Sequence, residues 1–185
     1  VATNRNDILH RLISNNEYSL GDLEHTLSPS MDIMVSSNFE RYLFDLFDRD
    51  AEAVSRFVTT LGSEPQQLEP ERWQKARDLF SSLSVDDQTT CDVIASVYRD
   101  TEFLIDPHTA IGVKAARECN QDVSVPMITL ATAHPVKFAD AVEKAGLQSP
   151  ELPAHLHDLF EREERYDVLD NDINVITEYM QQRLC

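Results

Sequence analysis

A hydroxyl and an imidazole stand together at the end of one apolar run. Thr132 and His134 follow the uncharged run Met127 to Ala131, and Pro135 comes next. Such a run is typical of a strand buried on both faces, and a proline favours the first turn of a helix. Because ligands of open α/β sheets bind outside the carboxyl ends of strands, we expect both side chains to face a ligand. The alternative is that Thr132 is an ordinary strand-end residue and His134 only a helix cap.

A second imidazole lies in the segment Asp106-Pro-His-Thr-Ala110. Asp106 has the type and position of a helix N-cap, and Pro107 suits the first helical residue. His108 would then lie in the first turn, where the positive end of the helix favours a neutral imidazole. It either faces a pocket or faces solvent.

Hydroxyl side chains also gather between residues 25 and 38, where neither helical nor strand periodicity is present. We expect an ordered loop here, with Ser28 and Ser30 available to bind a polar ligand and Met31 holding the loop to the core. Ser37 or Asn38 can equally serve only as the cap of the following helix.

The elements that must position these residues begin at the amino end. Val1 to Thr3 is typical of the end of a strand, and a helix with Asn4 or Asn6 as its cap should follow and end at Asn15-Asn16. Residues 38–104 carry a series of helical patterns, in which Ser84 is expected to open a helix and Cys91 to face the core. Since a strand needs neighbours, we expect the chain to be the carboxy-terminal part of a longer protein.

Composition excludes several classes of function. The formal net charge of −17 over 185 residues argues against binding to nucleic acid or to an anionic membrane surface. Cys91, Cys119 and Cys185 are odd in number and widely spaced, which indicates thiols of a reducing compartment and a cytoplasmic location. No metal site is expected, and the sequence contains no GxSxG, P-loop, GxGxxG or HExxH motif.

Five segments together resemble the threonine synthase family, in particular its bacterial and fungal branch. They occur in order from the first residue to beyond two thirds of the chain. They read Val1-Ala-Thr-Asn-Arg-Asn-Asp-Ile-Leu9, Thr26-Leu-Ser-Pro-Ser-Met-Asp-Ile33, Ser36-Ser-Asn-Phe-Glu-Arg41, Asp106-Pro-His-Thr-Ala110 and Ala131-Thr-Ala-His-Pro-Val-Lys-Phe138. Several are five or more residues long, so the match is specific, and it covers only the carboxy-terminal portion of such an enzyme.

The resemblance implies a fold and a reaction. The fold is α/β, a partial tryptophan-synthase β-like domain of pyridoxal-phosphate fold type II, helix-rich and with few strands in this part. The reaction converts O-phosphohomoserine and water to L-threonine and phosphate with pyridoxal 5'-phosphate. The Schiff-base lysine is expected upstream, so this chain should hold no catalytic residue of that kind and should be inactive alone; Lys137, although inside a matching motif, is not that lysine.

The resemblance also implies roles for individual residues. Thr132 would be the hydroxyl partner of the pyridine nitrogen of the cofactor, which suits a ring that need not stay protonated. Candidates for the substrate pocket are Ser28, Ser30, Met31, Asp32, His108 and His134. Two alternatives are a threonine-synthase-like phospholyase or dehydratase and a noncatalytic helical interaction module.

Four segments follow from this assignment. Residues 1–37 form a strand, helix and loop of the large pyridoxal-phosphate domain, and residues 38–104 a helical insertion or subdomain. Residues 105–148 add a helix, strand and helix that complete the domain, and residues 149–185 form carboxy-terminal helices. The expected partner is the upstream part of the same enzyme.

Overall fold

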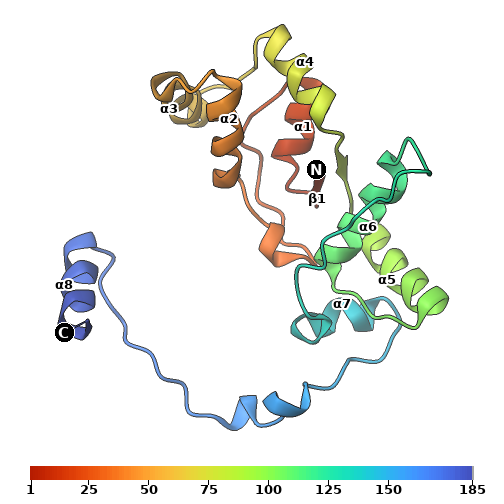
Figure 1. Cartoon of the computed structure of the whole chain (residues 1–185). Helices are drawn as coiled ribbons and strands as arrows, with labels where there is room; N and C mark the ends of the chain where they lie inside the picture. Colours follow the sequence, from red (N-terminus) through yellow and green to blue (C-terminus); the bar gives the residue numbers. More distant parts are fainter. Residues whose placement is uncertain (185) are drawn as a thin grey trace. The chain divides into compact units, whose positions relative to one another are not determined.

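The computed structural model describes residues 1–184 (Figure 1). The chain divides into two compact units, Val1–Glu151 and a second unit that begins at Leu152. All candidate site residues named above belong to the first unit.

The only strands among residues 1–184 form a parallel pair. β1 (Ala2–Thr3) lies beside β2 (Leu83–Ser84), with Ala2 opposite Leu83 and Thr3 opposite Ser84. The backbone N–H of Leu83 donates to the Val1 carbonyl at 3.0 Å and that of Val85 to the Thr3 carbonyl at 2.9 Å. The predicted strand at Val1 to Thr3 is confirmed.

Four helices and three 3-10 turns fill the chain between and around these strands. α1 (Ile8–Asn15) ends at Asn16, whose φ of 56° gives the left-handed C-cap that asparagine tolerates. The others are the turns η1 (Pro29–Met31), η2 (Ser37–Phe39) and η3 (Thr60–Gly62), and the helices α2 (Glu40–Leu46), α3 (Ala51–Thr59) and α4 (Pro70–Leu79). Asp50 caps α3 by accepting from the Ala53 backbone N–H at 3.0 Å.

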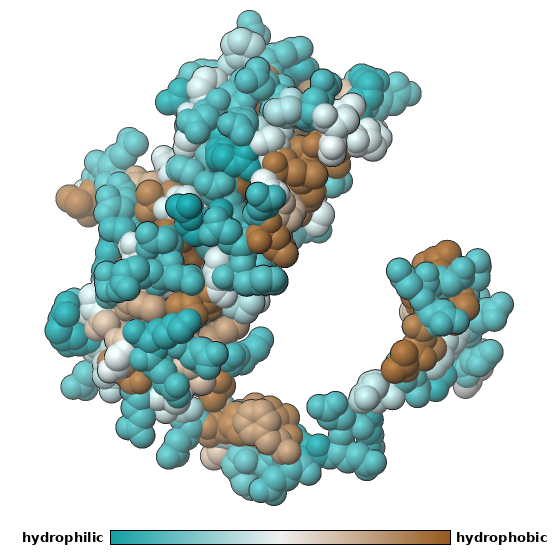
Figure 2. All heavy atoms as spheres, turned by 180° about the vertical axis from the view of Figure 1, so that it is seen from behind, coloured by the Kyte–Doolittle hydropathy of each residue, from teal (hydrophilic) through white to brown (hydrophobic). Residues whose placement is uncertain are grey.

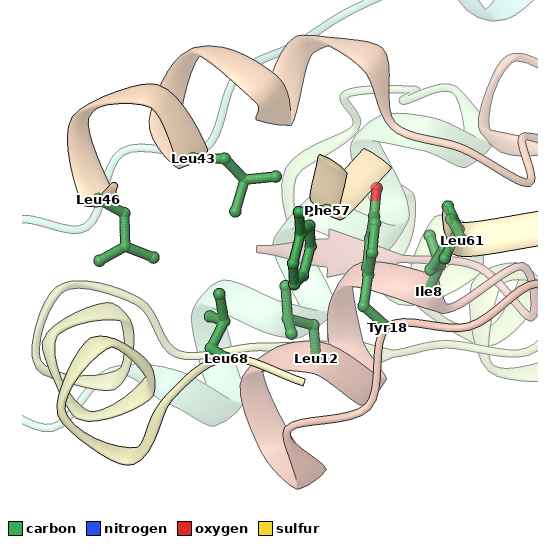
Figure 3. Packing of buried hydrophobic residues seen from close by; sticks show 8 residues of the cluster. All are labelled: Ile8, Leu12, Tyr18, Leu43, Leu46, Phe57, Leu61 and Leu68. Carbon is green, nitrogen blue, oxygen red and sulfur yellow. The ribbon is translucent and has the colours of Figure 1, made fainter. Parts of the chain in front are cut away.

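These four helices share one hydrophobic core (Figure 3). The rings of Tyr18 and Phe57 stack at its centre, with centroids 5.6 Å apart and an interplanar angle of 18°. Trp73 on α4 donates from Nε1 to the Leu12 carbonyl at 2.9 Å, which ties α4 to the end of α1. The buried members are Ile8, Leu12, Tyr18, Leu43, Leu46, Phe57, Leu61 and Leu68.

A second core lies among the remaining helices of the first unit. α5 (Asp87–Thr101) packs along α6 (Pro107–Cys119), and α7 (Ala139–Lys144) follows the 3-10 turn η4 (Pro135–Phe138) and packs on α5. Gly146, with φ of 78°, closes α7 in a conformation that an L side chain would strain. The buried members are Val93, Ile94, Ile105, Ala110 and Ala141. Cys91 is also buried, as predicted.

The predicted strand at Met127 to Ala131 is wrong. The segment is extended but belongs to no strand, and Ile128 and Leu130 are 81% and 74% exposed. A strand buried on both faces needs ladder partners and covering layers, and among residues 1–184 this segment has neither. It lies instead against α6, where a Cβ built on Gly112 would come within 3.0 Å of the Thr129 Cγ2 atom.

Three predictions of helix caps are also wrong. Asp7 occupies the N-cap position of α1, whereas Asn4 binds Asp32 just after η1 and Asn6 binds Glu24 in the loop before it. Ser84 lies in β2 and donates to the Asn4 carbonyl at 2.9 Å, while Asp86 caps α5. Ser37 and Asn38 lie inside η2, and α2 begins after it without a side-chain cap.

The second unit contains little regular structure. It consists of the 3-10 turns η5 (Ala154–Leu156) and η6 (Leu159–Glu161) and the helix α8 (Ile173–Arg183), which Asp172 caps. α8 carries apolar side chains to its surface, among them Ile173 and Met180 (Figure 2). Among residues 1–184, no helix has both the length and the hydropathy needed to cross a bilayer.

The first core gives a stability prediction. Leu12 is fully buried, so Leu12→Ala should remove its transfer free energy and leave a cavity, lowering the free energy of unfolding by about 2–5 kcal/mol in urea denaturation. Leu79→Ala makes the same change at a side chain that is 67% exposed and should alter stability by no more than about 0.5 kcal/mol. Equal losses in the two variants would refute the assigned core.

Candidate functional site

The amino end of α6 is organised by one buried carboxylate. Asp106 is only 1% exposed, and its Oδ1 atom accepts from the backbone N–H groups of His108 at 2.9 Å and Thr109 at 3.4 Å. Pro107 occupies the first helical position, where no N–H is needed. The predicted N-cap at Asp106 is therefore confirmed.

The same carboxylate binds two side chains of the first turn. The Nδ1 atom of His108 lies 2.8 Å from Asp106 Oδ1, and the Thr109 hydroxyl donates to Asp106 Oδ2. An ionised carboxylate can only accept hydrogen bonds, so both partners must direct a hydrogen toward it. This requirement fixes the tautomer of His108 and the direction of the Thr109 hydroxyl.

These hydrogen bonds control the charge of Asp106. Burial on its own would raise the pKa of this carboxyl, because it penalises the ionised form. The side-chain hydrogen bonds from His108 and Thr109, together with the two backbone bonds, outweigh burial and lower the pKa below its ordinary value. Asp106 is therefore an anion at neutral pH.

His108 joins α6 to the loop that contains η1. Its Nε2 atom accepts from the Ser30 backbone N–H at 3.1 Å, and its ring meets that of Phe138 edge-on with centroids 4.6 Å apart. Because a backbone N–H only donates, Nε2 must be unprotonated, and the imidazole is neutral with its hydrogen on Nδ1. His108 is 6% exposed, so the alternative of a solvent-facing histidine is wrong.

Thr109 makes the equivalent connection to the segment that carries Thr132. Its Oγ1 atom accepts from the Thr132 backbone N–H at 3.2 Å. The first turn of α6 therefore holds the backbone of two segments that are remote in sequence, one at Ser30 and one at Thr132.

Thr132 and His108 line one cavity of about 520 Å³, the Thr132 cavity. Within residues 1–184 no hydrogen bond is made by the Thr132 hydroxyl, so it remains available to a ligand. Met31 forms another part of the wall, and α6 contributes Gly112 and Ala115. Figure 1 shows α6 beside β1, which brings the first residues of the chain to the same cavity. Its remaining lining residues are Val1, Ala2, Leu79, Ser81, Ala116, Cys119, Met127, Ile128, Thr129 and Leu130.

Ser28 and Asp32 are not in the lining of this cavity. Ser28 is 1% exposed, and its Oγ atom accepts from Asn4 Nδ2 at 3.0 Å. Asp32 Oδ1 accepts from Asn4 Nδ2 at 2.8 Å and from Asn6 Nδ2 at 3.0 Å, and Thr26 donates to the same carboxylate. The two residues hold the loop to the segment after β1, which gives them a structural role in this geometry.

Ser30 and His134 also lie apart from the wall of the Thr132 cavity. Ser30 is exposed and reaches the site only through its backbone N–H. His134 caps η4 by accepting from the Val136 backbone N–H at 3.2 Å, as in the cap alternative. It lines a second cavity of about 340 Å³, to which Asp106 and Thr109 also contribute.

Another cavity of the first unit, of about 610 Å³, lies between α2 and α3. Phe44, Val54 and Val58 form its apolar lining, with Glu40 and Arg41 at its charged part. It contains none of the candidate residues, so the chemistry of the site lies at α6.

Sequence reasoning assigned no role to Thr109 and mistook Asn4 and Asn6 for caps. A hydroxyl three residues after a capping aspartate was the available signal for Thr109, since N3 lies within reach of the cap side chain. No comparable signal marked Asn4, because its partners Thr26, Ser28 and Asp32 lie 22 to 28 residues away.

The Asn4 contacts predict a sensitive position. Asn4→Asp keeps the shape of the side chain but replaces the donor Nδ2 with a carboxylate oxygen facing Asp32 Oδ1. We expect a loss of about 1–3 kcal/mol in the free energy of unfolding at neutral pH. Asn38→Asp changes an exposed residue just before α2 and should be neutral or slightly stabilising. Similar stabilities for the two variants would contradict this account.

The lowered pKa of Asp106 predicts a dependence of stability on pH. Its ionised form stabilises the fold above the unfolded pKa of about 3.9, and this contribution is lost as pH falls through the lower folded pKa. Asp106→Asn cannot titrate, so the stability difference between the parent chain and this variant should narrow from about pH 6 towards about pH 2. Urea denaturation across this range measures it, and a constant difference would argue against the assignment.

Comparison with known proteins matches this chain to one family. A family model described as "Threonine synthase, C-terminal" matches residues 109–180. The threonine synthase of Pseudomonas aeruginosa is 59% identical over 184 residues, covering 98% of this chain and 39% of that protein. The threonine synthase of Saccharomyces cerevisiae is 36% identical over 163 residues, 78% of this chain and 32% of the relative.

Solved structures agree with the sequences. A PLP-bound threonine synthase from Brucella melitensis superposes with a TM-score of 0.86 at 43% identity, covering 98% of this chain and 39% of that one. Yeast threonine synthase gives a TM-score of 0.81 at 32% identity, covering 99% of this chain and 41% of that one. The predicted helix-rich α/β fold, a partial pyridoxal-phosphate fold type II domain with few strands, is confirmed.

The match covers only part of each relative. The chain spans 39%, 39% and 41% of the length of the threonine synthases from Pseudomonas aeruginosa, Corynebacterium glutamicum and Eremothecium gossypii. Within that span the agreement extends over nearly all of this chain. The chain belongs to the threonine synthase family and corresponds to the carboxy-terminal portion of its members.

Proposed function

We propose that this chain forms part of the active site of a threonine synthase that converts O-phosphohomoserine and water to L-threonine and phosphate with pyridoxal 5'-phosphate. The observation that carries the proposal is that Thr132 and His108 line one cavity in a chain 59% identical to a threonine synthase. The threonine synthase of Brucella melitensis, which is PLP-bound and 43% identical to this chain, supports the choice of cofactor.

The Thr132 cavity fits one end of this cofactor. The Thr132 hydroxyl has no partner among residues 1–184 and can donate to a ring nitrogen. A hydroxyl carries no charge, so it orients the ring without forcing the nitrogen to be protonated. When bound, pyridoxal phosphate would supply an electron sink for a carbanion on the substrate, and Thr132 would fix how the ring lies in the cavity.

The other residues of the cavity support a neutral, largely apolar environment. His108 presents a neutral ring whose two nitrogen atoms are already hydrogen-bonded to Asp106 and Ser30. His108 therefore has a positioning role, without a free proton to exchange. Met31 adds an apolar surface that limits access of water.

The lysine that would bind the cofactor covalently is assigned to another part of the enzyme. Among residues 1–184 no lysine lines the Thr132 cavity. Lys137 lies in η4 with its Nζ atom 5.8 Å from the centroid of the Phe138 ring, and Lys114 pairs with Glu118 at 2.7 Å. We assign the lysine to an upstream portion of the same enzyme, which is then the partner of this chain. The chain alone is expected to be inactive.

The remaining assignments are coarser. Two of the candidates for the substrate pocket, Met31 and His108, reach the Thr132 cavity. The other four lie outside its lining and stay candidates that act on the substrate only through neighbouring residues: Ser28, Ser30, Asp32 and His134. The proposal includes a cytoplasmic location, which the scattered cysteines favour. It includes no contact with nucleic acid, which the net charge of −17 disfavours.

The experiment compares Thr132→Ala and Thr132→Ser in the enzyme that joins this chain to its upstream portion. Losing the hydroxyl removes one hydrogen bond to the cofactor, so Thr132→Ala should lower kcat for O-phosphohomoserine by about tenfold or more. Thr132→Ser keeps the hydroxyl and should retain most of the activity. Release of phosphate and formation of threonine are measured together.

The products separate the proposed reaction from its alternatives. Threonine as the main product supports a synthase, whereas 2-oxobutanoate would indicate a phospholyase or dehydratase. Unchanged turnover in Thr132→Ala would refute the role of Thr132 and favour a noncatalytic interaction module.

A further inference from the structure

Two segments that contribute to the proposed site are held by backbone N–H groups, and both bonds lead to the first turn of α6. The Ser30 N–H donates to His108 Nε2 at 3.1 Å, next to Met31 in the cavity wall. The Thr132 N–H donates to Thr109 Oγ1 at 3.2 Å. Ser30 and Thr132 are 102 residues apart in sequence, and the two acceptors are adjacent residues.

Both acceptors are made into acceptors by Asp106. A histidine or a threonine side chain can present either a hydrogen or a lone pair to a given neighbour. The carboxylate of Asp106 takes the hydrogen of His108 Nδ1 and that of the Thr109 hydroxyl, which leaves lone pairs for Ser30 and Thr132. A side chain that could donate toward either residue would release this constraint.

We propose that Asp106 is a positioning residue for the site: through His108 it fixes the backbone at Ser30, and through Thr109 it fixes the backbone at Thr132. The two connections are separate, because each uses its own carboxylate oxygen and its own side chain. Asp106 contributes nothing directly to the lining of the Thr132 cavity. The inference rests on the proposed function only in treating Thr132 as a ligand contact.

The selectivity of the two connections provides the test, read out by NMR as amide hydrogen exchange in the enzyme that joins this chain to its upstream portion. Thr109→Val has nearly the same shape but no hydroxyl, so the Thr132 amide should exchange about five- to tenfold faster while the Ser30 amide is unchanged. Thr109→Ser restores the acceptor and should restore slow exchange at Thr132.

Asp106→Asn tests whether the carboxylate acts through Thr109. The asparagine oxygen can keep the Oδ1 contacts with the helix cap and with His108, while its NH₂ group faces Thr109 in place of Oδ2. The Thr132 amide should then exchange faster, again without a change at Ser30. The double variant Asp106→Asn/Thr109→Val should show no faster exchange of the Thr132 amide than Thr109→Val alone, because both changes break the same connection.

A matched control comes from the neighbouring helix. Thr90 on α5 is 1% exposed, and its hydroxyl donates to the Asp86 carbonyl at 2.8 Å. Thr90→Val deletes a buried hydroxyl at the start of a helix without touching Ser30 or Thr132. It should leave exchange at both amides unchanged.

Exchange that rises equally at Ser30 and Thr132 in Thr109→Val, or additively at Thr132 in the double variant, would overturn the inference. These measurements need neither cofactor nor turnover. The selective exchange pattern together with full activity of the Thr132→Ala enzyme would therefore refute the proposed function alone.

Discussion

The first unit depends on a buried carboxylate that would be costly if its hydrogen bonds were missing. Asp106 is 1% exposed and has as donors two backbone N–H groups, the imidazole of His108 and the hydroxyl of Thr109. Transfer of an unpaired carboxylate from water into such an environment would cost several kcal/mol. The four donors offset that cost only in one arrangement. The anion therefore stabilises one geometry of the α6 turn, and it contributes to the stability of the fold through that geometry.

This constraint extends outward because both side-chain donors also accept a hydrogen bond, His108 through its Nε2 atom and Thr109 through the same Oγ1 atom. His108 accepts a hydrogen bond from the Ser30 backbone N–H and so holds the loop at that residue. Asn4 holds the same loop, because its amide donates to Ser28 and Asp32. The loop is thus bound by polar groups at Ser30 and at residues on either side of it, which explains how a segment without regular structure keeps a defined shape. Met31 takes its position in the cavity wall from these bonds.

The start of α6 was predictable because it depends on residues close in sequence. The structure of the apolar run around Ile128 was not, because it depends on residues far away in sequence. Asp106 and Pro107 specify the start of the helix through contacts within three residues, and Gly146 similarly specifies the end of α7. The apolar run around Ile128 has the composition of a buried strand, but burial depends on partners that composition does not identify. The prediction of a cap at Asn4 was wrong for the same reason: an asparagine that caps a helix and one that hydrogen-bonds a distant loop cannot be told apart by residue type.

Thr132 combines a recognisable local motif with a contact that depends on a residue distant in sequence. Its motif predicts a ligand contact through resemblance to the family, and the strand expected to present it is absent among residues 1–184. The backbone at this residue is nevertheless fixed, because Thr109 supplies the hydrogen-bond acceptor that a neighbouring strand would otherwise have offered. A helix terminus can therefore hold the end of an extended segment without a sheet ladder. The Thr132 N–H is thus occupied by a hydrogen bond, whereas within residues 1–184 its hydroxyl remains available to bind a ligand.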